Sequence, residues 1–495
     1  MNYKSLCRFI SLILVIVAGL MFPALILALA FHEPHAATAY WQSIGIILVL
    51  GGLFFLLSRG EKAGDFYEKE GLACAGLSWI IMGLTGALPF FLSREIPAYI
   101  DAFFETVSGF TTTGASILSE VESMSKSLLY WRSFTHWIGG MGVLVFLLAL
   151  VPRGNKGSGF TLHLLRAESP GPSVGKLVPQ IHKTARILYL IYVGLTLLDF
   201  GILALGGLFF HDGQHPTGVF DAFCIAVGTA GTGGFAVINA GLGGYSIFTQ
   251  VVTTVFMFLF GINFSCYFLI LRGDVKSVIK DEELRTFLII SLLAIVAFTV
   301  SIIPQYQSTG AAIKDAAFTV GSLASTTGYA TTNFNTWPNF TRAIVVFLTI
   351  MGACAGSTCG GAKVIRLILV VKNLFRNLRQ MIRPNRIVHV RINKRVVSEG
   401  VLTNLNTYLA AYVFLLFISY FLVAFDGQDG TTTFTAVLTC FNNVGPGLGE
   451  VVGPVGNFGS FSVGAKLVLI VDMLLGRLEI FPILALLSRS TWSHS

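Results

Sequence analysis

Three segments of this chain repeat one pattern: an Asp-Ala pair, a mostly apolar run, and a glycine thirteen positions after the aspartate. They are Asp101–Gly114 (DAFFETVSGFTTTG), Asp221–Gly234 (DAFCIAVGTAGTGG) and Asp315–Gly328 (DAAFTVGSLASTTG), and a fourth, without the aspartate, ends at Gly445 (TFTAVLTCFNNVG). We call these four the glycine segments. Each is expected to form about two turns of helix and then a short extended strand. Four of them in an apolar chain predict a ring of loops around one axis, which is how backbone carbonyls surround a dehydrated cation.

The composition indicates a membrane protein. Hydrophobic residues make up 54% of the 495 positions and charged residues 12%, whereas a soluble domain carries about 25% charged residues. A membrane-spanning helix needs about 20 apolar residues. Ten spans are predicted on this basis, over residues 6–31, 41–58, 71–93, 130–151, 185–210, 246–271, 286–305, 341–371, 404–425 and 461–488. The chain is therefore expected to lie in a lipid bilayer as an all-α polytopic protein.

The first apolar run resembles a secretion signal but is too long for one. Lys4 and Arg8 precede it, and Ala28-Leu29-Ala30 has the small residues of a cleavage site. A signal core has only about 7–15 apolar residues. A retained first span is therefore favoured.

Lysine and arginine are unevenly distributed between the spans. One set of connections carries 25 of them: residues 1–8, 59–70, 152–184, 272–285, 363–395 and the C-terminal tail. The opposite set, which includes the glycine segments, carries six. Because cytoplasmic loops are the basic ones, both termini are expected in the cytoplasm, and the glycine segments are expected to enter the membrane from outside.

Residues 363–395 contain ten basic residues and no acidic one. Two compatible interpretations are open: anchoring against anionic lipid headgroups, and docking of an acidic cytosolic partner. Nucleic-acid binding is not expected, because the segment adjoins a span and contains no known nucleic-acid module.

No catalytic or metal-binding pattern is present. The seven cysteines lie mostly in apolar stretches, which favours packing over a disulfide framework. Cys354 and Cys359 are close in sequence, but no histidine or carboxylate nearby completes a metal site. The chain also lacks a phosphate-binding loop and a dinucleotide fingerprint. Any nucleotide regulation must therefore come from another chain, and no cofactor is expected in this one.

After the first two spans, the chain runs span, glycine segment, span four times. The final glycines lie 120, 94 and 117 residues apart. This predicts four covalently linked span–pore-loop–span repeats with pseudo-fourfold symmetry, plus two extra N-terminal transmembrane helices. The expected division is 1–70 for the two N-terminal helices, 71–151 for the first repeat, 152–184 for a cytoplasmic loop, 185–285 for the second repeat, 286–395 for the third with the basic segment, and 396–495 for the fourth.

The residues before each final glycine suit a lining of carbonyl groups. They are Thr111-Thr112-Thr113, Gly231-Thr232-Gly233, Ser325-Thr326-Thr327 and Asn442-Asn443-Val444. Most are small or have a side chain that can turn away from the axis. The preceding short helices would point their negative C-terminal ends at the centre and so favour a cation. The alternative is that these segments are ordinary re-entrant turns that fill gaps between helices.

Several motifs resemble one family. SGFTTTGAS, TGGFAV, STTGYATTNF and NNVGPGLG are similar to the four filter segments of the Trk/Ktr/HKT potassium transporter superfamily. RAESPGPSVGKLVP (166–179), GINFSCY (261–267), DEELRTFL (281–288), GACAGSTCGGAKVIR (352–366) and GRLEIF (476–481) resemble its Trk branch. The resemblance covers nearly the whole chain. It implies a potassium uptake protein of the bacterial inner membrane, a homodimer, and a cytosolic TrkA-like nucleotide-binding regulatory subunit.

The resemblance also assigns residues. By position, it puts the potassium-binding carbonyls on Thr112, Thr113, Thr232, Gly233, Thr326, Thr327, Asn443 and Val444, and the filter glycines at Gly114, Gly234, Gly328 and Gly445. Gly233 and Gly234 compete for one place, and counting from Asp221 selects Gly234. Family members with serine at the first filter glycine are associated with sodium conduction, so glycine at all four positions favours potassium.

Residues 352–361 are all small and interrupt one predicted span. From the sequence alone, a break in the helix and tight helix–helix packing are equally consistent with them. The resemblance favours an intramembrane gating loop that includes Gly356, Ser357 and Thr358, although Cys359 and Ala362 depart from the usual pattern.

Arg477 lies inside the last span, where a charge is costly unless it faces protein or water. Pairing with Asp472 or Glu479, or extension to the inner membrane face, is one interpretation. The resemblance instead implies a position below the filter against the gating loop, as a barrier to cations. Glu105 on the first pore helix either orients the filter backbone or bonds a neighbour, and Arg132 and His136 are expected to be structural.

Other functions stay open at this point. One is a sodium-permeable or proton-coupled transporter of the same fold. Another is a membrane enzyme or a non-conducting sensor, although ionisable groups in the spans are sparse. The sequence does not distinguish channel-like from coupled flux.

Overall fold

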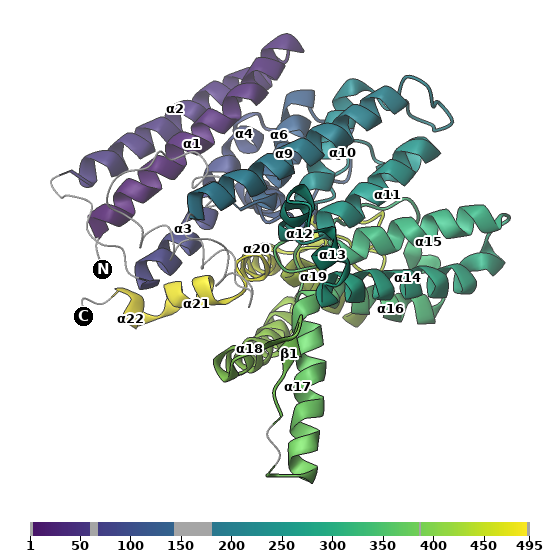
Figure 1. Cartoon of the computed structure of the whole chain (residues 1–495). Helices are drawn as coiled ribbons and strands as arrows, with labels where there is room; N and C mark the ends of the chain where they lie inside the picture. The colour runs from purple at the N-terminus through teal and green to yellow at the C-terminus, as the bar shows by residue number, and fades with distance from the viewer. Residues whose placement is uncertain (1–2, 60–67, 143–180, 386–387, 493–495) are drawn as a thin grey trace.

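The computed structural model describes residues 3–59, 68–142, 181–385 and 388–492. This part of the chain is mostly helical (Figure 1). It contains one small antiparallel sheet, formed by β1 (Arg391–Ile392) and β2 (Arg395–Val396). The predicted loop 152–184 lies outside the described residues except for its last four positions, which begin a helix. The all-α prediction is confirmed.

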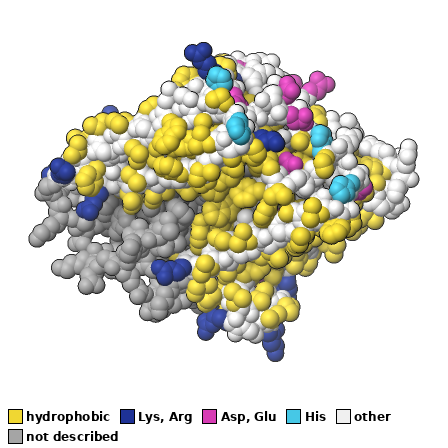
Figure 2. Space-filling model, turned by 90° about the horizontal axis from the view of Figure 1, so that it is seen from above, with side chains coloured by type: hydrophobic (Ala, Val, Ile, Leu, Met, Phe, Trp, Pro, Cys, Tyr) yellow, Lys and Arg dark blue, Asp and Glu magenta, His cyan; other side chains and the backbone are white. Residues whose placement is uncertain are grey.

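Six helical stretches within the described residues are long and apolar enough to cross a membrane. They are α1 (Tyr3–Ala30), α2 (Pro34–Leu57), α3 (Glu68–Gly86) continued by α4 (Leu88–Leu92), α9 (Ile181–Gly206), α14 (Glu282–Ile302) and α18 (Glu399–Ala424). Each coincides with a predicted span. Hydrophobic side chains cover much of the face seen in Figure 2, as expected for a surface that contacts lipid.

The glycine segments form the C-terminal parts of four short, largely buried helices. These are α5 (Tyr99–Phe110), α10 (Val219–Gly231), α15 (Thr309–Ala324) and α19 (Gly430–Asn442). With 12 to 16 residues each, they are longer than the expected two turns. The predicted helices were too short because the observed helices begin before the aspartates, for example at Tyr99 and Thr309.

Four predicted spans are not single straight helices. Each begins with a helix of 13 to 15 residues, namely α6 (Lys126–Gly140), α11 (Ile247–Gly261), α16 (Asn339–Met351) and α20 (Val463–Arg477). A break was expected only in the span 341–371; the breaks in the predicted spans 246–271 and 461–488 were not anticipated. Beyond residue 142, the predicted span 130–151 lies outside the described residues.

A glycine marks the end of each of these four helices. Gly140 and Gly261 are the last residues of α6 and α11, Gly352 follows α16, and Gly476 is the penultimate residue of α20. Beyond these points lie α12 (Phe264–Leu271), bent by 89° from α11, the loop 352–363, and α21 (Phe481–Leu487). Glycine lowers helix stability, which favours the breaks at these places. After the break, Asn263 caps the N-terminus of α12 by accepting a hydrogen bond from the Ser265 N–H.

After the loop 352–363 the chain continues into α17 (Val364–Ile382), which extends away from the body of the molecule (Figure 1). This helix carries much of the basic segment and also exposes apolar side chains such as Phe375 and Met381. Two short helices, α13 (Val275–Ile279) and α22 (Arg489–Trp492), complete the α-helical elements of the described residues.

The start of α19 depends on a capping aspartate, Asp429. Its carboxylate accepts hydrogen bonds from the N–H groups of Thr431 and Thr432, at 3.0 and 3.1 Å. We predict that Asp429→Ala lowers the free energy of unfolding by about 1 kcal/mol, because both N–H groups lose their acceptor. Asp429→Asn keeps an acceptor and is expected to match the wild type. Denaturation of the detergent-solubilised protein measures both variants, and equal losses in both would contradict the capping role.

Candidate functional site: a ring of four backbone turns

The four short helices end in the same turn. The N–H of Thr113 bonds the Ser108 carbonyl five residues back at 2.9 Å, and Gly233, Thr327 and Val444 make the equivalent bond at 2.8 to 3.0 Å. The preceding residue is left-handed in every case: Thr112, Thr232, Thr326 and Asn443 have φ of 54° or 55°. This is the Schellman ending of a helix, which usually has glycine at the left-handed position.

Threonine in this conformation is strained, because its branched Cβ crowds the backbone. Such a residue costs about 1–3 kcal/mol and persists only when its surroundings hold it in place. The surroundings here are polar contacts of the side chains. The Thr326 hydroxyl accepts from the Gly360 N–H at 2.7 Å, and the Asn443 amide donates to the Met473 carbonyl at 2.9 Å.

The final glycines also share one conformation. Gly114, Gly234, Gly328 and Gly445 have φ between 77° and 94°. Gly233 has no positive φ, so Gly234 is the residue that matches the other three.

Each final glycine lies against the backbone of a neighbouring segment. A methyl group added to a glycine would collide with a carbonyl oxygen, in the order Gly114 with Gly233, Gly234 with Thr327, Gly328 with Val444, and Gly445 with Thr113. The order closes on itself, so the four segments surround a common centre. The four glycines also line one cavity of about 270 Å³.

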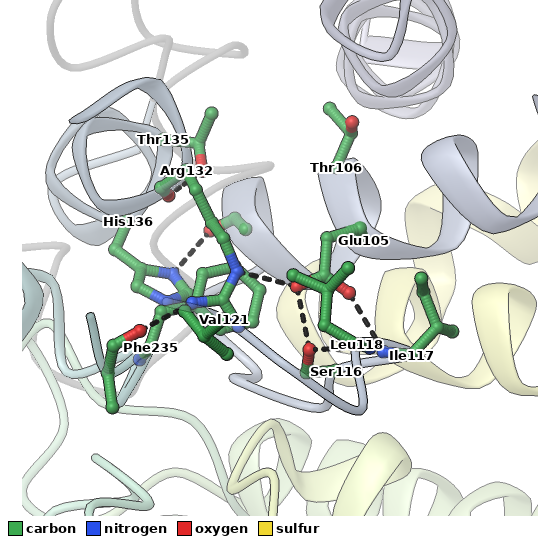
Figure 3. A network of polar contacts seen from close by, with 12 residues as sticks. Glu105, Thr106, Ser116, Ile117, Leu118, Val121, Arg132, Thr135, His136 and Phe235 are labelled. Atoms are coloured by element: carbon green, nitrogen blue, oxygen red, sulfur yellow. Dashed lines mark hydrogen bonds and ion pairs between the residues drawn. The ribbon is translucent and has the colours of Figure 1, made fainter. Parts of the chain in front are cut away.

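A buried polar network lies behind the first two segments (Figure 3). Glu105 on α5 forms an ion pair with Arg132 on α6 at 2.6 Å, and both side chains are at most 3% exposed. The Glu105 carboxylate also accepts from the Ser116 hydroxyl and the Ile117 N–H, both at 2.9 Å. Glu105 therefore holds the backbone that follows Gly114, through its hydrogen bonds with Ser116 and Ile117.

Residues 352–363 form a loop between α16 and α17, which we call the small-residue loop. It contacts the ends of the third and fourth segments. The Gly360 N–H donates to the Thr326 hydroxyl at 2.7 Å, and the Gly361 N–H donates to the Asn442 carbonyl at 3.0 Å. A methyl group on Gly360 would collide with the same Asn442 oxygen. Of the two alternatives that the sequence left open, the structure shows the break in the helix, and the small residues of the resulting loop pack closely on the fourth segment.

Of the three proposed gate residues in this loop, two make backbone contacts that fix its path. The Gly356 carbonyl accepts from the Phe264 N–H at 3.0 Å. The Thr358 carbonyl accepts from Arg477 at 2.8 Å. Ser357 instead bonds within the loop, to the Cys354 carbonyl.

Arg477 lies where three elements meet. Its guanidinium donates to the Thr358 carbonyl of the loop, to the Thr112 hydroxyl at 3.1 Å, and to the Gly140 carbonyl at the end of α6 at 2.8 Å. The two carboxylates that the sequence offered as partners of Arg477 each bond another group. Asp472 accepts from Ser419, and Glu479 pairs with Arg366.

Sequence reasoning missed a carboxylate that holds the loop. Glu283 on α14 is buried and accepts from the N–H groups of Ala355 at 2.7 Å and Ile365 at 3.2 Å. In the sequence, the only indication of this role was that Glu283 is an acidic residue close to the start of an apolar span. In addition, the Lys363 ammonium donates to the Cys359 carbonyl. Within the described residues, no group of three or more His, Cys, Asp or Glu side chains could hold a metal ion.

Comparisons with known proteins agree with this geometry. A family model described as a cation transport protein, TrkH, matches residues 42–493. The Trk system potassium uptake protein TrkH of Salmonella typhimurium is 33% identical, with 99% of this chain and 100% of that protein covered. The Trk system potassium uptake protein TrkG of Escherichia coli is 30% identical, with 95% of each covered.

A solved structure is also similar along its full length. The crystal structure of the potassium transporter TrkH from Vibrio parahaemolyticus has a TM-score of 0.87 and 30% identity, with 100% of both chains covered. Family model, relatives and structure all extend across the ring, the small-residue loop and Arg477. The chain therefore belongs to the TrkH family of cation transport proteins.

Proposed function

We propose that this chain takes up potassium through the ring of four turns, which acts as a selectivity filter. The family consists of transporters, so the chain is a transporter and not an enzyme. The observation that carries the proposal is the closed order of neighbours among the four glycines, with one backbone conformation at all four places.

The chemistry of the ring suits a dehydrated monovalent cation. The candidate carbonyls belong to Thr112, Thr113, Thr232, Gly233, Thr326, Thr327, Asn443 and Val444, which carry no charged side chain. Potassium would therefore exchange its water shell for peptide oxygens. The C-terminal ends of four helices meet at the ring, and their partial negative charge favours a cation there.

The gate would combine the small-residue loop with Arg477. The guanidinium bonds both the loop and Thr112, so its positive charge lies directly beside the filter. A cation passing this point meets electrostatic repulsion. Movement of the loop would withdraw the Thr358 carbonyl from Arg477 and free the arginine to move.

The membrane context supports the remaining parts of the proposal. In the proposed topology the chain lies in a bacterial inner membrane with both termini in the cytoplasm, which the distribution of lysine and arginine supports. The exposed helix α17, with its basic and apolar side chains, is then cytoplasmic and available to a TrkA-like regulatory subunit or to the second chain of a homodimer.

Uptake of radioactive rubidium or potassium into liposomes that contain the purified protein tests the function. We expect flux that responds to the membrane potential and saturates with potassium. Varying the sodium and proton gradients separately identifies coupling. Failure of the protein to carry potassium under any gradient, with sodium flux intact, would overturn the proposal in favour of a sodium transporter.

Gly114→Ser is predicted to lower the permeability ratio of potassium to sodium by about tenfold, the effect of roughly 1.4 kcal/mol. The added side chain would collide with the Gly233 carbonyl at a residue whose φ is 78°. Gly273→Ser is a matched control, because Gly273 has φ of 81° but no atom within 4 Å of an added methyl group. Reversal potentials measure the ratio. An equal effect of both variants would argue against a role of Gly114 in selectivity.

Arg477→Ala is predicted to raise potassium flux several-fold, because removing the charge lowers the barrier beside Thr112. Arg477→Lys keeps the charge but not the forked hydrogen bonds, so an intermediate flux is expected. Arg342→Ala, at an arginine outside the site, is the control. Wild-type flux in a folded Arg477→Ala protein would refute the gating role.

A further inference from the structure

Helix α6 belongs to the first unit but contacts the glycine segment of the second. The His136 ring on this helix bonds two backbones: Nδ1 lies 2.8 Å from the Gly109 carbonyl oxygen, and the Phe235 N–H donates to Nε2 at 3.3 Å. A carbonyl can only accept and an N–H can only donate. These partners therefore fix the neutral ring with its proton on Nδ1, and His136 joins pore helix α5 to the residue after Gly234.

The second segment has a side-chain gap that this imidazole fills. At the position before the final glycine, the other segments carry Thr113, Thr327 and Val444, whereas the second carries Gly233. A methyl group on Gly233 would overlap the His136 ring. Because Gly233 has no positive φ, its backbone tolerates a side chain, and the ring is the reason that none fits.

Two of the other segments hold this position by contacts of their own side chains. The Thr113 hydroxyl bonds the Thr111 hydroxyl at 2.8 Å, and the Thr327 hydroxyl bonds the Ser325 hydroxyl at 2.6 Å. Gly233 has no hydroxyl for such a bond. In the second segment, the bond from Phe235 to His136 supplies the side-chain support from another unit.

Arg132, one turn earlier on α6, makes the second contact with the same strand. Its guanidinium donates to the Ala236 carbonyl at 2.8 Å and lies 3.6 Å from the centre of the Phe235 ring. The Glu105 carboxylate holds this guanidinium and also the residues that follow Gly114. Figure 3 shows these side chains converging on the strand from α5 and α6.

We propose that His136 and Arg132 are positioning residues for the second filter strand: they set the place of the Thr232 and Gly233 carbonyls and so the ion selectivity. The inference rests on the proposed function, and it adds that one quarter of the ring is held from a neighbouring unit. Two buried polar side chains carry it, and His136 is fully buried. Loss of either contact lets the carbonyls shift relative to those of the other three strands.

Two substitutions of His136 separate its two bonds. The amide oxygen of glutamine reaches the place of Nε2 and can accept from Phe235, whereas the amide nitrogen of asparagine takes the place of Nδ1 and can donate only to Gly109. We expect His136→Gln to keep the potassium-to-sodium permeability ratio within about twofold, and His136→Asn and His136→Ala to lower it about fivefold or more, the effect of one hydrogen bond. Reversal potentials in proteoliposomes provide the ratios.

If His136 has a merely structural role, the permeability ratios of the glutamine and asparagine variants are expected in the opposite order. If His136 only held α6 against α5, asparagine would preserve the ratio as well as or better than glutamine, and that result would overturn the proposal. Trp137→Phe is the matched control, because Trp137 is the next residue on α6 and its indole donates to Thr196 on α9 at 3.2 Å. It is expected to leave the ratio unchanged.

A second experiment tests the overlap between His136 and Gly233. Gly233→Ala alone is expected to lower the ratio, because the methyl group displaces the imidazole. Combined with His136→Ala, the same methyl group has space, so the double variant is expected to be less impaired than the product of the two single effects. A double variant that shows the full product of both effects would contradict the inference.

The wild type separates this inference from the proposed function. A wild-type protein that carries no potassium refutes the proposed function itself. A potassium-selective wild type with the same ratio in all His136 variants refutes only the positioning role.

Discussion

The left-handed turn at the end of each short helix is the constraint on which the site depends. It reverses the backbone so that a helix carbonyl is satisfied within the turn while the next residues run on as an extended strand. Three of the four turns have threonine where glycine would be unstrained. Threonine supplies what glycine lacks, a hydroxyl on the side of the small-residue loop and Arg477, and two of these hydroxyls contact those elements.

This choice connects the ring, the proposed filter, to the small-residue loop and Arg477, the proposed gate, through the same residues. Thr112 and Thr326 belong to the strained turns, and their partners are Arg477 and Gly360. Any movement of the loop therefore removes contacts that help to hold the turns. Conversely, a distorted turn weakens the contacts that hold the loop in place. The ring and the small-residue loop, which the sequence indicated as separate features, are therefore joined by hydrogen bonds.

The features that could be predicted from the sequence have local signals. The spacing of the repeated pattern predicts final glycines such as Gly114, and the run of small residues predicts the small-residue loop. The breaks near Gly261 and Gly476 were missed because the sequence on both sides is mostly apolar, although a glycine lies at each break. The contacts of His136 and Glu283 could not be predicted, since 99 and 72 residues separate them from Phe235 and Ala355, and no local pattern records such a distance.

The early ends of α6, α11, α16 and α20 have a consequence for the backbone that follows them. A helix of 15 residues at about 1.5 Å per residue reaches about 22 Å, less than the roughly 30 Å of the hydrocarbon layer. Each of these helices alone is therefore too short to cross the membrane. The backbone that follows, such as the small-residue loop, depends on hydrogen bonds within the protein, for example from the Gly361 N–H to the Asn442 carbonyl, because lipid offers its polar groups no partner.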